Sequence, residues 1–306
     1  MSTRSASQIR QHTDFLHQYT TDFAIEINAH PPGSSTKDFL VTIESFMISI
    51  NDSFLKRHDP LDFIEADLHY IWHMAIEVAK ITDPGDTTHN SLVLLLLYFK
   101  ELGTLRQVVD GVEQEAVMNN GERLWTDLPF FASDLLAVWK QSVGMIAKQR
   151  TNLAAFTGKC VAHGVGGANN VLSTSWLLKG LEEDRELDIL VVELVHACTA
   201  LLQNCYHKLL KLCNSNDSQF SMVRWLSWRK RLQELSRSED KNVAEEAKRG
   251  FDIMINCGRE MGYIVEGEEK YWAKVTGLLV DELKRSGKES VGLEDIVTDP
   301  AWADEE

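Results

Sequence analysis

Two groups of acidic and histidine residues are spaced so that they could do chemistry. The first is Glu193 with His196, whose three-residue spacing puts both side chains on one face of a helix that is apolar on nearly every other side. Such a pair can act as a general acid or base, and ferritin-like bundles use two such pairs for a di-iron site. A second Glu-x-x-His pair is missing, and the nearest imitations are Asp14 with His17 and Asp86 with His89. We therefore predict that Glu193 and His196 are buried or line a pocket, as candidate catalytic residues that bind no metal.

The second group is Glu65, His69, His73 and Glu77, spaced by four residues along one predicted helix. Adjacent members could share a metal ion, but a metalloprotease helix would need the HExxH order, which is absent. The apolar residues of this helix lie off the stripe. We therefore interpret the stripe as the solvated side of an amphipathic helix, and we expect the protein to use no metal and no cofactor.

The cysteines form an odd set without a CxxC pair or a close Cys/His zinc spacing. They are Cys160, Cys198, Cys205, Cys213 and Cys257. Reduced thiols are the simplest account of such a set. The first thirty residues lack the continuous apolar run of a secretory signal, so we expect a cytoplasmic protein. The longest apolar run, from Leu92 to Phe99, is far shorter than the roughly 20 residues that cross a bilayer, so we expect no membrane partner.

The chain is acidic, with 46 Asp and Glu residues against 31 Lys and Arg residues and a formal net charge of −15. Nucleic acid is a poor partner for it, because binding to phosphates requires a basic footprint. The one dense basic group alternates with Trp225, Leu226, Trp228 and Leu232, which is typical of an amphipathic helix with a basic edge. This group consists of Arg224, Arg229, Lys230 and Arg231.

Apolar residues recur at helical spacing along nearly the whole chain, whereas sustained period-two alternation is hard to find. We therefore predict an all-α fold, a single bundle of roughly ten helices without a structural sheet. The predicted helices cover about residues 15–27, 35–50, 60–81, 88–117, 172–182, 187–213, 220–235, 243–261 and 270–284, and a further helix, approached through residues 124–131, contains residues 135–139.

We expect residues 1–298 to form one all-helical domain, because six prolines and no long Ser/Gly tract leave few places for a linker. A chain of 306 residues is large enough to bury a core without disulfides or metals. Residues 299–306 are acidic and are expected to form a frayed tail.

Several motifs follow one another between residues 124 and 182. They are Leu124-Trp125-Thr126-Asp127-Leu128-Pro129-Phe130-Phe131, then Trp139, then Thr151-Asn152-Leu153-Ala154-Ala155-Phe156, then Trp176 with Leu177-Leu178-Lys179-Gly180-Leu181-Glu182. This series resembles the signature of a helical family of filamentous fungi catalogued as domain of unknown function number 3632, over about residues 71–261. The resemblance implies a fungal source and a helical fold, and it implies no catalytic residue.

The motif residues have a structural interpretation of their own. Thr126 can cap a helix, Asp127 complements the positive end of that helix, and Pro129 is tolerated in a first turn. The large aromatic side chains are expected to pack in the core rather than hold a cofactor. Our candidates for a pocket wall are Trp125, Asp127, Trp139 and Trp176.

Two functional classes remain. The protein could be an accessory or interaction protein that presents an acidic surface to a protein partner and performs no chemistry. Alternatively, it could be a metal-free helical enzyme or binder that acts on an apolar small molecule in fungal secondary metabolism, with Glu193 and His196 as acid and base. A closed core would favour the first class, whereas a cavity of several hundred Å³ reached by His196 would favour the second.

Overall fold

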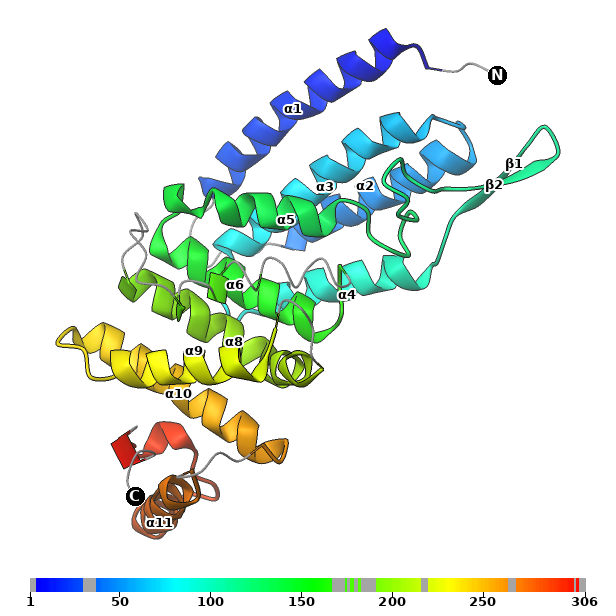
Figure 1. Cartoon of the computed structure of the whole chain (residues 1–306). Helices are drawn as coiled ribbons and strands as arrows, with labels where there is room; N and C mark the ends of the chain where they lie inside the picture. The colour runs from blue at the N-terminus through cyan, green and yellow to red at the C-terminus, as the bar shows by residue number, and fades with distance from the viewer. Residues whose placement is uncertain are drawn as a thin grey trace. The chain divides into compact units, whose positions relative to one another are not determined.

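The chain is predominantly α-helical in a computed structural model, which describes residues 4–29, 37–166, 174, 177, 178, 181, 182, 191–215, 220–263, 268–299, 301 and 302. These residues contain ten α-helices and one small two-stranded sheet (Figure 1), so the predicted all-α fold is confirmed. Contacts within the chain divide it into two compact units, Met1–Leu177 and Leu178–Glu306. Whether both units belong to the one domain predicted from the sequence stays a prediction.

The first unit is organised around α3 (Leu61–Ile81), which contacts five other helices. They are α1 (Ala6–Asn28), α2 (Lys37–Leu55), α4 (Thr87–Glu101), α5 (Phe131–Lys140) and α6 (Ala147–Ala162). Twelve residues of α3 are buried, and they face more than one side of the helix. Pro60 stands at the N-cap, where its missing N–H costs nothing, so the predicted start of this helix is confirmed.

The turn Asp83-Pro84-Gly85-Asp86 separates α3 from α4 (Thr87–Glu101), as its residue types predict. The Asp86 carboxylate caps α4 by accepting a hydrogen bond of 2.7 Å from the backbone N–H of Thr88. Such a bond satisfies one of the free N–H groups at the start of the helix.

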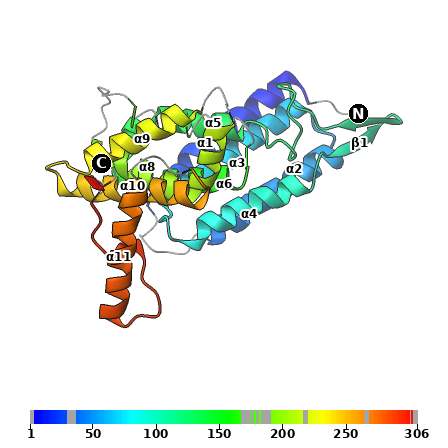
Figure 2. The ribbon, with the colours of Figure 1, turned by 60° about the horizontal axis from the view of Figure 1, so that its bottom comes forward.

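The predicted continuation of this helix to Val117 is wrong, because the chain leaves the helix after Glu101 and forms a β-hairpin. Gly103 has a φ of +72°, and β1 (Arg106–Val109) then pairs antiparallel with β2 (Val112–Glu115). Asp110 and Gly111 both have positive φ, as the tightest hairpin turns require, and Asp-Gly is a preferred pair for that geometry. Figures 1 and 2 show the hairpin projecting beyond the helices of the first unit.

The end of the first unit contains α5, the short 3-10 helix η1 (Ser142–Gly144) and α6. The sequence did not predict α6 as a helix, although it lies over the Asn-Leu-Ala-Ala-Phe motif. Trp125, Trp139 and Phe156 are fully buried, which confirms their predicted place in the core. The indole N–H of Trp139 donates to the Thr157 hydroxyl at 3.1 Å. Trp176 lies outside the described residues.

The second unit is built on α10 (Lys241–Glu260), which contacts α8 (Val191–Asn214) and α9 (Met222–Leu235). Helix α11 (Glu268–Ser286) and the 3-10 helix η4 (Leu293–Asp295) follow along the chain. Gly250 of α10 allows a close approach, because a Cβ there would lie 2.9 Å from the hydroxyl oxygen of Thr199 in α8. The predicted helix at about 172–182 falls largely outside the described residues, as do residues 303–306 of the predicted tail.

Helix α9 confirms the predicted amphipathic pattern with a basic edge. Trp225 and Trp228 are buried on its inner face. The indole N–H of Trp228 donates to the Glu182 carboxylate at 2.6 Å, and Arg224 forms an ion pair with the same carboxylate. Part of the basic edge is therefore neutralised within the unit.

Candidate ligand pocket

The loop between β2 and α5 contains most of the Trp-Thr-Asp-Leu-Pro motif, and its backbone is strained. Trp125, Leu128 and Phe130 have φ values of +64°, +51° and +67°, in the left-handed region that side chains disfavour. Each such residue costs on the order of 1–3 kcal/mol, and strain of this kind concentrates at functional sites. Three strained residues within six positions therefore mark this loop for closer inspection.

Two carboxylates fix the strained loop. Asp127 accepts hydrogen bonds from the backbone N–H and the guanidinium Nε of Arg123, at 2.8 and 3.0 Å. The side-chain hydrogen bond from Arg123 holds the pKa of Asp127 below its ordinary value. Glu122 accepts hydrogen bonds from the side-chain amide of Asn120 at 2.8 Å and from the backbone N–H of Phe130 at 3.2 Å. Both of these donors to Glu122 are neutral.

Two indoles attach the same loop to the core of the first unit. The indole N–H of Trp125 donates to the side-chain oxygen of Asn51 at 2.6 Å, which ties the loop to α2. The indole N–H of Trp72 donates to the carbonyl oxygen of Pro129 at 2.7 Å, which ties it to α3. These bonds hold the loop against two helices of the unit and offset part of its backbone strain.

The predicted role of Thr126 as a helix cap is wrong. Helix α5 begins at Phe131, five residues later, and Phe130 occupies the N-cap position. The hydroxyl of Thr126 instead lies 2.9 Å from the hydroxyl of Thr104, which follows α4. The reason is the left-handed backbone at Trp125, Leu128 and Phe130, which keeps the intervening residues out of a helix.

The strained loop and the first turns of α5 enclose a cavity of about 340 Å³. It is lined by Asn120, Glu122, Asp127, Leu128, Phe130, Ala132, Ser133, Leu136 and Gly166. This volume lies within the range of small-molecule sites, and the wall combines apolar side chains with a few polar groups, as such sites do. Of the predicted pocket residues Asp127 lines the cavity, whereas Trp125 and Trp139 are buried in the core behind it.

Glu193 and His196 belong to the second unit and are not enclosed as predicted. Both are half-buried, and the His196 side chain is 39% exposed. The imidazole Nε2 of His196 lies 4.0 Å from a carboxylate oxygen of Glu246 on α10. The physical reason is that the polar positions of α8 recur every three or four residues down to the exposed His207, so that they form one outward stripe. A catalytic role for the pair stays a prediction.

Only part of the stripe on α3 is the solvated face that we expected, because α1 packs against α3. His69 is exposed, Glu65 and His73 are half-buried, and Glu77 is buried. Glu77 is only 4% exposed and binds the Lys80 ammonium at 2.7 Å. His73 lies 3.1 Å from the carbonyl oxygen of Thr20 in α1, and burial lowers the pKa of its imidazole.

His69, on the same stripe, pairs instead with Asp134 of α5 at 2.7 Å. The hydrogen bond that Asp134 accepts from the His69 imidazole raises the pKa of His69. The members of the stripe therefore have separate partners, with no shared centre between them. Within the described residues no three His, Cys, Asp or Glu side chains are arranged to hold a metal ion.

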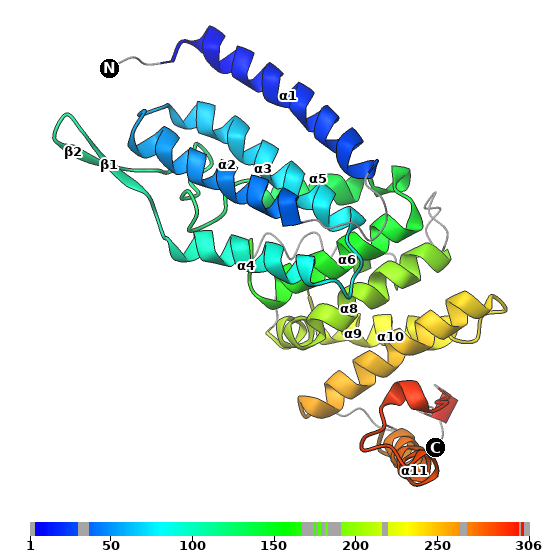
Figure 3. The same cartoon turned by 180° about the vertical axis from the view of Figure 1, so that it is seen from behind.

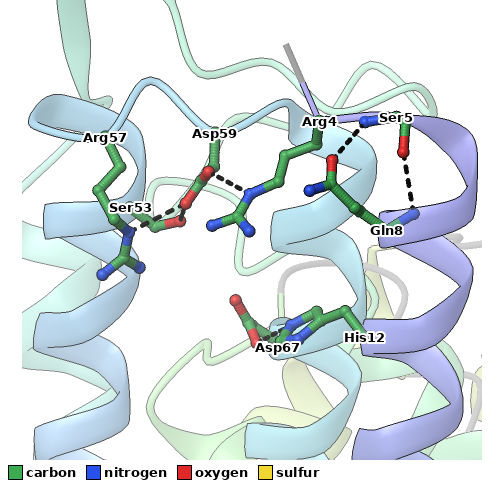
Figure 4. Close-up of polar contacts among 8 residues, drawn as sticks. All are labelled: Arg4, Ser5, Gln8, His12, Ser53, Arg57, Asp59 and Asp67. Carbon is green, nitrogen blue, oxygen red and sulfur yellow. Dashed lines mark hydrogen bonds and ion pairs between the residues drawn. The ribbon is translucent and has the colours of Figure 1, made fainter. Parts of the chain in front are cut away.

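A polar cluster that was not predicted from the sequence attaches the N-terminus to the connection between α2 and α3 (Figure 4). Asp59 is buried and accepts hydrogen bonds from Arg4 at 2.8 Å, Ser53 at 2.6 Å and Arg57 at 3.0 Å. Burial opposes ionisation, but these hydrogen bonds hold the pKa of Asp59 below its ordinary value. The only signal in the sequence was an acidic residue before Pro60, at the start of a helix.

Eight residues further along from Arg4 and from Asp59, His12 of α1 lies 2.8 Å from the Asp67 carboxylate of α3. The His12 ring also stacks on Phe63, with ring centroids 3.8 Å apart. Burial raises the pKa of Asp67, and His12 opposes that rise. Together with the Asp59 cluster, this contact fixes α1 on α3, so we interpret these residues as an anchor for the N-terminal helix.

Residues 72–232, more than half of the chain, match the family model described as "Protein of unknown function (DUF3632)". The chain belongs to this family. The resemblance predicted from the motifs is thereby confirmed. The strained loop and every residue that lines its cavity lie inside the matched segment. Among the described residues of this DUF3632 protein, no helix combines the length and hydropathy that a bilayer crossing requires.

One relative of this DUF3632 chain is "Oxopyrrolidines biosynthesis cluster protein G" from the fungus Penicillium oxalicum. The two proteins are 27% identical over 243 residues, which cover 64% of this chain and 68% of the relative. No solved structure matches the chain. The fungal relative in a biosynthesis cluster agrees with the secondary-metabolism context expected from the sequence.

Proposed function

We propose that this protein is an accessory protein of a fungal secondary-metabolite pathway and that it binds a small pathway molecule in the cavity at the strained loop. One observation supports the proposal most directly. The family motif, with three residues held in left-handed backbone, builds the wall of a cavity of about 340 Å³. Backbone strain persists only where the surrounding structure enforces it, and here that structure shapes a concave surface. The relative's place in a biosynthesis cluster supplies the pathway context.

The wall of the cavity suits a ligand with an apolar body and an N–H donor. Leu128, Phe130 and Leu136 provide apolar contact area. The Glu122 carboxylate can accept an N–H bond from the ligand, since a carboxylate has room for more than the two neutral donors it already binds. The Ser133 hydroxyl can donate to a carbonyl oxygen. A lactam, the chemical class in the name of the relative's cluster, offers both groups on one small ring.

The geometry supports binding more than proton transfer. Arg123 keeps Asp127 ionised by lowering its pKa, so this carboxylate is a poor general acid at neutral pH. Its hydrogen bonds to Arg123 also serve to hold the loop. We therefore propose that Asp127 maintains the shape of the cavity and that Glu122 recognises the ligand.

Binding of two matched probes tests this proposal. The first is 5-pentyl-2-pyrrolidinone, and the second is 3-pentylcyclopentanone, which has a similar ring with the tail at the same distance from the carbonyl group but no N–H. We expect isothermal titration calorimetry to show the lactam binding about tenfold more tightly, because one hydrogen bond to a charged group is worth about 1.5–3 kcal/mol. Equal affinities, or no binding of either probe, would contradict the proposed recognition.

Glu122→Gln is the variant that tests the named carboxylate. Glutamine keeps an acceptor oxygen for the loop but removes the charge, so we expect lactam affinity to fall about fivefold while the thermal midpoint changes little. Glu101→Gln, at the exposed end of α4, makes the same chemical change outside the cavity and should bind like the wild type. An equal effect of both variants would refute the role of Glu122. The neighbourhood of the gene tests the pathway assignment separately, because biosynthetic genes should lie beside it.

A further inference from the structure

Helices α2 and α4 expose apolar side chains on one face of the first unit. Val41 is 61% exposed on α2, and Leu94 and Tyr98 are 64% and 57% exposed on α4. The two helices contact each other and are seen from behind in Figure 3. Large exposed apolar residues gathered on adjoining elements are typical of a binding surface rather than of a solvated one.

A groove of about 400 Å³ runs between these helices. It is lined by Leu40, Val41, Glu44, Ser91, Leu94, Leu95 and Tyr98. Further exposed apolar residues continue both edges, at Ile48 and Leu55 on α2 and at Leu102 on α4. The α2 positions recur every seven residues and the α4 positions every four, which is the periodicity of a helix surface that accepts another helix.

The charge of the groove indicates the kind of helix it fits. Glu44 is the charged residue in the lining. At the ends of the two helices the exposed Asp38 and Glu101 stand next to Lys37 and Lys100, and the Lys100 ammonium donates to the carbonyl oxygen of Gly164 at 3.2 Å. Lys56, at the far end of α2, is already paired with Asp52 at 2.9 Å. The whole chain has a formal net charge of −15, so a second copy would be repelled, whereas a basic partner would be attracted.

We infer that the α2/α4 groove binds an amphipathic helix of a partner protein, with the apolar face of that helix in the groove and Lys or Arg side chains beside Glu44. This interaction surface is separate from the small-molecule cavity, whose lining comes from residues 120–136 and Gly166. Either proposal can therefore fail without the other.

Three designed 18-residue peptides test the inference by fluorescence anisotropy with the full chain. One has a Leu stripe with Lys edges, the second has the same stripe with Glu edges, and the third is a scrambled Leu/Lys sequence without a stripe. We expect the Lys-edged helix to bind at least tenfold more tightly than either of the others. Equal binding of the Lys-edged and scrambled peptides would overturn the inference, because it would show attraction by charge alone.

Two surface variants locate the interaction. Leu94→Glu should weaken the Lys-edged peptide at least tenfold, although it adds a negative charge, because it removes apolar contact in the groove. Glu44→Lys should reverse the preference toward the Glu-edged peptide. Val223→Glu is the control, because it makes the same kind of change at another site. Val223 is 78% exposed and lies on α9. An equal loss of peptide affinity with Val223→Glu would overturn the assignment to the groove. A wild-type dimer that Leu94→Glu dissociates would also overturn it, because the occupant of the groove would then be a second copy of the chain.

Discussion

His89 should make the folded protein sensitive to mild acid. Its side chain is fully buried at the start of α4, where Nε2 lies 3.0 Å from the carbonyl oxygen of Ala79, so the neutral imidazole donates this bond. Burial lowers the pKa of His89 from 6.5 to about 4. The unfolded chain therefore binds a proton between these values and the folded chain does not, so stability is present above pH 6.5 and is lost as the pH falls toward 4. Linkage gives a loss of about 2 kcal/mol in the free energy of unfolding between about pH 7.5 and pH 5.

The measurement is urea unfolding of the wild type and of His89→Gln at both pH values. The glutamine amide can keep the hydrogen bond to Ala79 but cannot titrate, so the loss of stability on acidification should be smaller in the variant by about 2 kcal/mol. Comparing the pH dependence removes the packing cost of the substitution, because that cost is present at both pH values. His163→Gln, at the exposed end of α6, is the matched control and should retain the full wild-type loss. An unchanged pH dependence in His89→Gln would refute a neutral buried imidazole.

Three further predictions concern the two units. Trp125→Phe should cost about 1–3 kcal/mol in urea unfolding, because it removes the bond to Asn51 and leaves a half-buried acceptor unpaired; an unaffected midpoint would contradict that bond. The five buried thiols should react with a thiol reagent near pH 8 only after denaturation. The reason is that burial raises the thiol pKa, to about 12 for Cys198, Cys213 and Cys257, and fast reaction of the native protein would show that the thiols are accessible. His196→Ala should change the free energy of unfolding by less than about 1 kcal/mol, because the side chain is half-exposed, and a larger loss would restore the buried role first predicted for it.

The sequence was sufficient for most of the helices, because these have an apolar stripe with a 3.6-residue period and clear ends, whereas α6 was missed. The segment 60–81 is an example, with Pro60 at one end and a Pro-Gly turn after the other. The hairpin at 106–115 was also readable, since Asp110-Gly111 between valines is a strong hairpin signal. It was missed because the apolar residues on both sides could be extended into one long helical pattern.

The candidate pocket could be predicted only in part. The motif marked the right segment and Asp127 lines the cavity, but the strained backbone has no signature in residue type, because tryptophan, leucine and phenylalanine occupy positions where glycine would be expected. The partial burial of His73 on the α3 stripe depends on α1, because the carbonyl oxygen that His73 contacts belongs to Thr20, 53 residues earlier in the sequence. Periodicity describes one helix at a time, so it cannot show which polar face another helix will cover.

The left-handed backbone at Phe130 gives the sharpest test of the strained loop. At an ordinary helical position glycine is less stable than alanine by about 0.5–1 kcal/mol, because glycine loses more backbone entropy on folding. At a φ of +67° the order should reverse, since alanine would suffer the Cβ clash of about 1–2 kcal/mol and glycine would not. Phe130→Gly should therefore unfold at a higher urea concentration than Phe130→Ala, although both lose the same aromatic ring. The same pair at Ser133, an exposed position within α5, should show the ordinary order. If alanine were the more stable residue at both positions, Phe130 would not be held in the left-handed region, and the strain that we connect with the cavity would be absent.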